Sequence, residues 1–146
     1  MTLFHPTSAT QLNLGLAILR IVLGITFAVH GAQKLFVFGL DGVSAGFAQS
    51  GIPLPGVVGP SVALVEFFGG LALIMGLLTR LAGFGLAIVM LGAALLVHFS
   101  AGFFLPNGYE FAFVLFGAAA TLAITGGGAF SLDAIVAGRR PTPARA

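Results

Sequence analysis

Residues 14–38 read LGLAILRIVLGITFAVHGAQKLFVF, and this stretch decides the class of fold. Its ionisable side chains are Arg20, His30 and Lys34, and most of the other residues are apolar. A helix rises about 1.5 Å per residue, so a stretch of this length can cross the ~30 Å hydrocarbon core of a bilayer. Ser8 lies just before the stretch and can cap the helix. The stretch therefore predicts a membrane-spanning helix.

Three more apolar stretches follow, at about residues 58–78, 81–99 and 110–126. Residues 79 and 80 leave room only for a tight turn, so the second and third spans must be antiparallel neighbours. The connection after the first span can form a short interfacial helix over residues 44–50. Helices are the only open-ended structure that satisfies its own backbone groups in lipid. The sequence therefore predicts four spans.

The composition supports the same class of protein. The chain has 146 residues, of which 58% are hydrophobic and 7% charged, and its mean hydropathy is +1.12. A soluble core of this size could not bury so much apolar surface. We predict an all-α transmembrane four-helix bundle in one domain, residues 1–137, surrounded by membrane lipids. Residues 138–146 are Arg- and Pro-rich and are expected to be a disordered cytoplasmic tail.

Charge and cysteine content exclude several function classes. The chain has six Lys and Arg residues and four Asp and Glu residues, which gives a net charge of +2. The basic residues are not clustered as they are in nucleic-acid-binding proteins. We therefore expect no nucleic-acid partner. The chain has no cysteine, which excludes disulfides, thiolate metal sites, iron–sulfur clusters and covalently attached c-type haem within it.

The distribution of basic residues predicts the orientation in the membrane. Four spans put the N-terminus, the turn at Arg80 and the C-terminus on one side. That side also carries Arg139, Arg140 and Arg145, whereas the other side has only Lys34. Basic residues favour the cytoplasmic side, so both termini are expected in the cytoplasm.

Ionisable groups from all four spans are predicted to converge in the outer half of the membrane. A charged side chain at the bilayer centre costs roughly 2.5–3.5 kcal/mol on insertion scales, so such residues need partners and often mark a site. Placed by depth along their helices, five groups fall near the outer surface, whereas Arg20 falls nearer the inner end. The five are His30, Lys34, Glu66, His98 and Glu110.

Helical spacing suggests which of these groups can meet. Arg20, Gly24, Phe27, Gly31 and Lys34 follow each other at spacings of four and three, which places them on one face of the first helix. A second such stripe runs along the second span and consists of Glu66, Gly69, Leu73, Gly76 and Arg80. If the stripes face each other, Lys34 can pair with Glu66. We expect Arg20, Lys34 and Glu66 to form structural ion pairs.

Each polar residue also has a simpler interpretation. Lys34 could extend to the outer interface, Glu110 could be an exposed acid at a helix N-terminus, and a histidine could bond a backbone carbonyl. Glu66 is the hardest to explain in this way. It lies well inside its span without a polar neighbour on its own helix, and therefore needs a partner or a proton.

The chain resembles the DoxX family of small four-helix membrane proteins over about residues 19–133. The resemblance implies a part of a membrane-bound redox system in the bacterial plasma membrane, because a thiosulfate:quinone oxidoreductase subunit gave the family its name and other members are linked to thiol and oxidative-stress complexes. It rests on LRIVLGITFAVHGAQKL (19–35), EFFGGLALIMGLLTR (66–80), His98, Glu110, and the exit with Gly126, Gly128, Ser131 and Asp133.

One interpretation of function is a quinone-facing subunit of a redox complex. His30 or His98 would hydrogen-bond a ring oxygen, and Glu66 would accept the proton of the reduced ring. The catalytic candidates are thus Glu66 and His30. The chain has no evident electron carrier, so a partner must bring the redox centre. The full candidate quinone-binding set is His30, Lys34, Glu66, His98 and Glu110.

The alternative is a non-catalytic structural or assembly subunit. In that case the polar set fixes helix register inside the bundle or against a larger membrane partner. A metal site made from His30, His98, Glu66 and Glu110 is disfavoured by the Lys34 cation, so we expect neither a metal nor an intrinsic cofactor. A membrane-protein partner or a homo-oligomer fits both interpretations.

Overall fold

The computed structural model describes residues 7–138. The first helix, α1 (Ala9–Ala32), begins at a capping box. The Gln11 amide donates to the Ser8 hydroxyl at 3.2 Å, and the Ser8 amide donates to the Gln11 side chain at 2.9 Å. The helix continues as a π-helical segment, η1 (Gln33–Phe38). Gly39, with φ of 70°, then allows the chain to turn into α2 (Gly39–Gln49).

A second long helix, α3 (Pro55–Met75), runs back along α1. It tolerates Pro55 at its start, because a first-turn amide has no helical acceptor. It ends at Gly76, whose left-handed φ of 70° closes the helix in the way glycine favours. A short turn leads into α4 (Thr79–Gly92), which also continues as a π-helical segment, η2 (Ala93–His98), and then as a short 3-10 turn, η3 (Phe99–Ala101).

The next helix, α5 (Glu110–Thr125), is shorter than α1 and α3, and α6 (Leu132–Val136) is a short closing helix. Within residues 7–138 no strand is present. The helical stretches that start at Ala9, Pro55 and Thr79 are long and apolar enough to cross a membrane. The prediction of an all-α transmembrane bundle is confirmed. The predicted tail lies outside the described residues except for Gly138.

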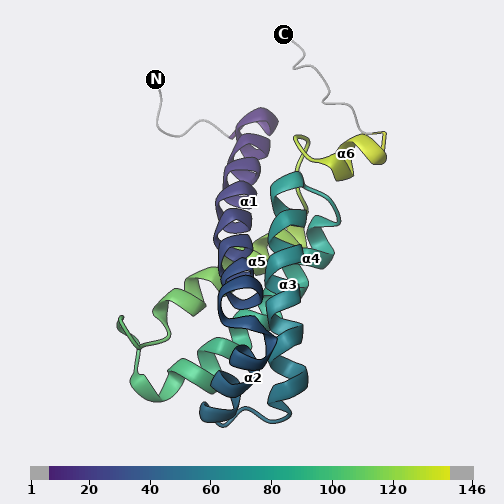
Figure 1. Cartoon of the computed structure of the whole chain (residues 1–146). Helices are drawn as coiled ribbons and strands as arrows, with labels where there is room; N and C mark the ends of the chain where they lie inside the picture. Colours follow the sequence, from purple (N-terminus) through teal and green to yellow (C-terminus); the bar gives the residue numbers. More distant parts are fainter. Residues whose placement is uncertain (1–6, 139–146) are drawn as a thin grey trace.

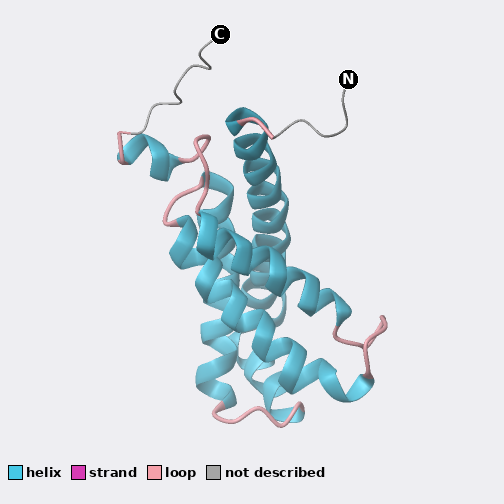
Figure 2. Cartoon of the chain, turned by 180° about the vertical axis from the view of Figure 1, so that it is seen from behind, coloured by secondary structure: helices cyan, strands magenta, loops and turns pink. Residues whose placement is uncertain are grey.

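Two helix pairs build the bundle. Helix α1 packs on α3, α4 packs on α5, and contacts between α3 and α4 join the pairs. Figures 1 and 2 show α2 and residues 102–109 at one end, which we call the cavity end. The start of α1, the α3–α4 turn and α6 lie at the opposite end, which we call the terminal end.

Glycines allow α1 and α3 to approach closely. A Cβ atom on Gly24 would lie 2.7 Å from the carbonyl oxygen of Gly70, and one on Gly70 would overlap the backbone of Ala28. The stripe predicted on the second span needs one change, because Gly70 faces α1 whereas Gly69 packs on Leu86 of α4. Close backbone approach is a common way for helices to pack in lipid, where apolar burial gives little driving force.

The terminal end is fixed by Arg20. This side chain is 3% exposed, and it donates to the carbonyl oxygens of Leu73, Ile74 and Phe130, each at 2.8 Å. The first two carbonyls belong to the last turn of α3, where acceptors lack helical partners. Arg20 was predicted to be one of the structural ion-pair residues, but within residues 7–138 its hydrogen-bond partners are these carbonyls, and the salt bridge found is between Lys34 and Glu66. Arg20 lies fourteen residues before Lys34, or about 21 Å along the helix.

Asp133 secures the α3–α4 turn from the other side. Its carboxylate accepts the amides of Leu78 and Thr79 at 2.7 and 2.8 Å, and thereby caps the start of α4. Burial alone would raise the pKa of Asp133, but the Thr79 and Leu78 hydrogen bonds and the nearby Arg20 charge hold it below the ordinary value. The turn needs this support because Leu78 adopts a left-handed φ of 49°, which is unfavourable for a residue with a side chain.

Candidate functional site

A cavity of about 490 Å³ separates the two helix pairs at the cavity end. Side chains of α1, α3, η2 and α5 form its walls, and residues from α2 and from the segment 102–109 close it. Most of the lining is apolar. The polar exceptions are four of the five groups that the sequence analysis placed in the outer half: His30, Lys34, Glu66 and His98.

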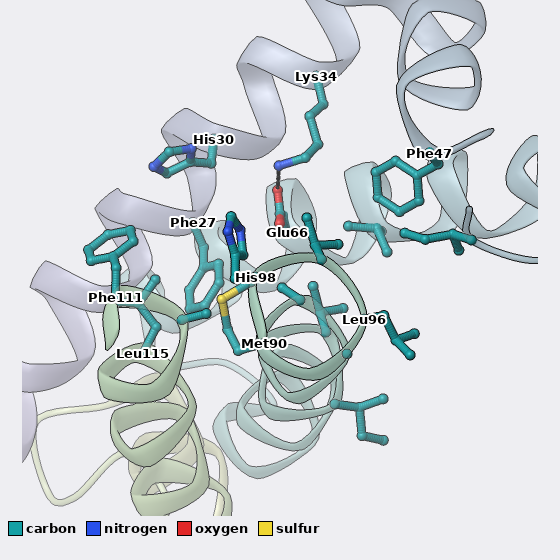
Figure 3. A pocket seen from close by; sticks show the side chains of 18 of the residues that line it. Phe27, His30, Lys34, Phe47, Glu66, Met90, Leu96, His98, Phe111 and Leu115 are labelled. Carbon is teal, nitrogen blue, oxygen red and sulfur yellow. Dashed lines mark hydrogen bonds and ion pairs between the residues drawn. The ribbon is translucent and has the colours of Figure 1, made fainter. Parts of the chain in front are cut away.

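Glu66 and Lys34 form an ion pair across the cavity wall. The Nζ atom of Lys34 lies 2.5 Å from Oε2 of Glu66, and Figure 3 shows the two side chains pointing at each other. The Glu66 side chain is 4% exposed, and that of Lys34 is 21% exposed. Glu66 has this position because it lies on the buried stripe of α3, one turn before Gly70. The pair joins η1 to α3.

His98, the last residue of η2, points into the cavity beside Phe27 and Met90 (Figure 3). Its Nδ1 atom lies 3.0 Å from the carbonyl oxygen of Asn107. The imidazole thus links the end of η2 to the loop that closes the cavity.

His30 lies at the rim between α1 and α5. Its ring faces Phe111, with the ring centres 6.5 Å apart and the planes inclined by 51°. Figure 3 shows His30 directed towards Phe111, whereas Lys34 is directed towards Glu66. The two residues are four apart, but the helix changes to π geometry at Gln33 between them. π-Helical segments often occur at functional sites, and both η1 and η2 contribute side chains to this cavity.

Glu110 does not line the cavity, although the sequence analysis included it in the binding set. Its Oε1 atom accepts the amide of Leu105 at 2.8 Å. Glu110 is the first residue of α5, where an acid is favoured by the helix dipole and can reach back to a preceding loop amide. It therefore holds the closing loop and does not face a ligand. Within residues 7–138 no three acidic or histidine side chains are grouped closely enough to bind a metal ion.

The sequence analysis missed the residues that close the cavity. Phe47 and Ile52 close it from the α2 side, and Leu105, Pro106 and Gly108 close it from the other loop. The sequence of residues 102–109, GFFLPNGY, is aromatic and rich in turn-forming residues, which is typical of a segment at the level of the lipid headgroups. A more specific signal is Gly108, since a Cβ atom there would overlap the backbone of Phe103 and Phe104. Such a residue indicates a tightly folded loop rather than a loose connection.

The arrangement limits the chemistry that the cavity can perform. It has one carboxylate, which is paired with Lys34, and two imidazoles. The apolar walls suit an uncharged ligand, and these polar groups can form hydrogen bonds with it. Its volume lies in the ~300–1,000 Å³ range of small-molecule sites.

Two protein families match this chain. The DoxX family matches residues 15–99, and the family described as "TQO small subunit DoxD", where TQO is thiosulfate:quinone oxidoreductase, matches residues 61–142.

Three curated bacterial proteins match along most of their length. "Putative oxidoreductase CatD" of Bacillus subtilis is 33% identical, over 85% of this chain and 88% of the relative. "Inner membrane protein YqjF" of Escherichia coli is 34% identical, over 85% and 93%, and an uncharacterised Haemophilus influenzae protein is 34% identical, over 81% and 87%. No solved structure matches significantly. The chain is a multi-pass membrane protein, and it belongs to the DoxX family.

Proposed function

We propose that this protein is a quinone-facing subunit of a membrane redox system, and that its cavity binds the quinone ring. The observation that carries the proposal is the meeting of an ion pair and two imidazoles in an otherwise apolar cavity of a membrane bundle. The match to a quinone oxidoreductase subunit family and the name of the Bacillus relative support a redox role.

The roles of the side chains follow from their positions. His30 at the rim and His98 inside the cavity hydrogen-bond ring oxygens, and Lys34 orients the carboxylate of Glu66, the proposed proton acceptor. When a quinol is oxidised to the quinone, both of its O–H bonds break: one proton passes to the Glu66 carboxylate, the other passes to a cavity imidazole, and the two electrons pass to a partner protein. The reverse reaction returns both protons to the ring oxygens. The apolar walls, among them Phe27 and Met90, hold the ring.

The electrons need a second protein. The chain has no cysteine and no nucleotide-binding fingerprint, so we propose that a partner carries the redox centre that takes up or supplies the two electrons. The cavity is unsuited to an anionic sulfur substrate, since its lysine is already neutralised by Glu66. Such a substrate would bind the partner. A membrane-protein partner or a second copy of the chain could complete the complex.

We place the protein in the bacterial inner membrane with both termini in the cytoplasm. The name of the Escherichia coli relative supports this location, and the basic residues listed above support the orientation. The cavity end then lies in the outer half of the bilayer, where a proton from Glu66 has a short path to the outer surface.

A binding measurement tests the proposal. Wild type and the Glu66→Gln variant are purified in lipid nanodiscs, bound quinones are identified by mass spectrometry, and the affinity for decylubiquinone and its quinol is measured. Asp41→Asn is the matched control, because Asp41 is an exposed acid in α2. We expect Glu66→Gln to weaken quinol binding about tenfold, because it removes a charge-assisted hydrogen bond. We expect Asp41→Asn to leave quinol binding unchanged. Absence of quinone binding by wild type would contradict the proposal.

The Lys34–Glu66 pair also favours a second candidate, a structural subunit, because it joins η1 to α3. That function predicts loss of a co-purifying membrane partner in the Glu66→Gln variant without any effect on quinone binding. Co-purification from native membranes separates the two candidates.

A further inference from the structure

The hydrogen bond of His98 fixes where its proton lies. Nδ1 lies 3.0 Å from the backbone oxygen of Asn107, and a carbonyl oxygen can only accept a hydrogen bond. Nδ1 must therefore carry the hydrogen. In a neutral imidazole this leaves Nε2 as an acceptor.

Nε2 of His98 is free and open to the cavity. It has no hydrogen-bond partner in residues 7–138, where the fully buried unpaired side-chain atoms are Arg20 Nε and Thr79 Oγ1. His98 lines the cavity, and Figure 3 shows its ring inside it. A ligand atom can therefore reach Nε2.

The neighbours of the His98 ring are uncharged or apolar. Among the described residues, the single carboxylate that lines the cavity, Glu66, is paired with Lys34. The Asn107 oxygen that contacts Nδ1 belongs to an uncharged carbonyl, and Figure 3 shows Phe27 and Met90 beside the ring. Nε2 is therefore the polar atom that His98 offers to a ligand.

We infer that His98 recognises a hydroxyl group of the ligand, and that the cavity therefore binds the reduced, dihydroxy form of a quinone more tightly than the dicarbonyl form. This inference rests on the proposed function and adds a preference for one redox state. A quinol has two hydroxyl groups, and the cavity offers two acceptors, Nε2 of His98 and the carboxylate of Glu66. A quinone carbonyl has no hydrogen to donate to either.

The loop that holds His98 is itself well fixed. The Gly108 amide donates to the Phe104 carbonyl oxygen at 2.9 Å, and the Leu105 amide donates to Glu110 at 2.8 Å. Glu110 is thus a positioning residue, which acts on His98 through the loop that carries the Asn107 carbonyl.

The first test measures the tautomer directly. Protein labelled with ¹⁵N-histidine is studied by NMR in nanodiscs near pH 7.5, and the His98 signals are assigned by their loss in the His98→Asn variant. We expect the neutral ring with the hydrogen on Nδ1. A hydrogen on Nε2, in either the other tautomer or the charged ring, would overturn the inference.

The second test measures the preference for the reduced ligand. Affinities for decylubiquinol and decylubiquinone are compared in oxygen-free buffer, and we expect wild type to bind the quinol about tenfold more tightly. His98→Asn keeps an amide donor near the Nδ1 position but lacks the acceptor at Nε2, so the ratio should fall below that of wild type, with Glu66 as the remaining acceptor. Thr121→Ala, at an exposed site on α5, is the control and should keep the ratio.

Each outcome has a distinct meaning. Equal binding of both forms by wild type overturns the inference and leaves the proposed function standing. A ratio in a folded His98→Asn variant that equals the wild-type ratio overturns the role of His98. Failure of wild type to bind either form overturns the proposed function and the ligand preference together. If His98→Asn does not fold, two measurements on wild type still test the inference: the ratio of its affinities for the quinol and the quinone, and the NMR detection of the hydrogen on Nδ1 of His98.

Discussion

Loss of Lys34 should destabilise the protein much more than loss of Glu66, although the two residues form one ion pair. The perturbations are Lys34→Met, Glu66→Gln and the double variant. Each single substitution removes one partner and leaves the other in the apolar cavity wall. The difference between them comes from the exposure of the partner that remains.

The expected magnitudes follow from that exposure. Lys34→Met leaves Glu66 without its partner. The Glu66 side chain is 4% exposed, and none of the other described Lys and Arg residues lines the cavity. Breaking a buried pair costs about 3–5 kcal/mol, and we expect about 3 kcal/mol here because the carboxyl can take up a proton. Glu66→Gln leaves Lys34, which is 21% exposed and can extend its ammonium group outward, so we expect about 1 kcal/mol. The double variant leaves no charge and should also lose only about 1 kcal/mol.

Unfolding in detergent measures these differences. The free energy of unfolding is obtained from denaturation followed by helical circular dichroism, and thermal unfolding gives an independent value. For a chain of this size about 3 kcal/mol corresponds to a decrease in Tm of roughly 6–12 °C. Arg80→Met is the control, because it removes an exposed cation at the terminal end.

The comparison can fail in two ways. Equal losses for Lys34→Met and Glu66→Gln would show that the two partners are equally buried, contrary to the structure. A double variant as unstable as Lys34→Met would show that the damage does not come from an uncompensated carboxylate. Either result would refute the account of this pair.

Three further variants and one control variant test the packing and the terminal end. Gly70→Ala should lose several kcal/mol, since its Cβ would overlap the α1 backbone at Ala28, whereas Gly15→Ala, with open space around it, should change stability by less than about 1 kcal/mol in unfolding experiments. Arg20→Lys should lose about 2–3 kcal/mol in the same assay, because an ammonium group cannot reproduce the guanidinium geometry that reaches three carbonyls. Asp133→Asn should lose about 1 kcal/mol near pH 7. Since the pKa of Asp133 is lowered by folding, its contribution is full well above 3.8 and is lost as the pH falls below 3.8, so the two unfolding curves should converge in acid.

The bundle could be predicted from the sequence because the length of the apolar stretches alone determines that they cross a membrane as helices. The stretch at residues 14–38 contains few polar groups, and the junction at residues 79 and 80 permits only a hairpin. The proximity of Lys34 and Glu66 was also predictable, because a spacing of four and three puts each on a buried stripe and lipid requires a partner for both.

Other features depend on three-dimensional details that no local pattern encodes. The partners of Arg20 are backbone carbonyls of α3 and of the segment before α6, and a carbonyl is present at every residue. The π-helical segment η1 begins between His30 and Lys34, although its sequence looks like ordinary helix, and the two side chains point to different neighbours. Glu110 meets Leu105 only because the loop between them folds back. These contacts depend on the path of loops, where helical periodicity gives no guidance.

Photoaffinity labelling tests the central claim most directly, namely that polar groups from separate helices form one quinone-binding cavity. An azidoquinone is photolysed with the protein in nanodiscs, and the labelled peptides are mapped by mass spectrometry with and without excess decylubiquinone. We expect competed labels on peptides with His30 and Lys34, with Val62 and Glu66, and with residues 105–108. Labels confined to the lipid-facing groove of Phe84, Leu91 and Ile124, or labels that excess quinone does not remove, would contradict the account.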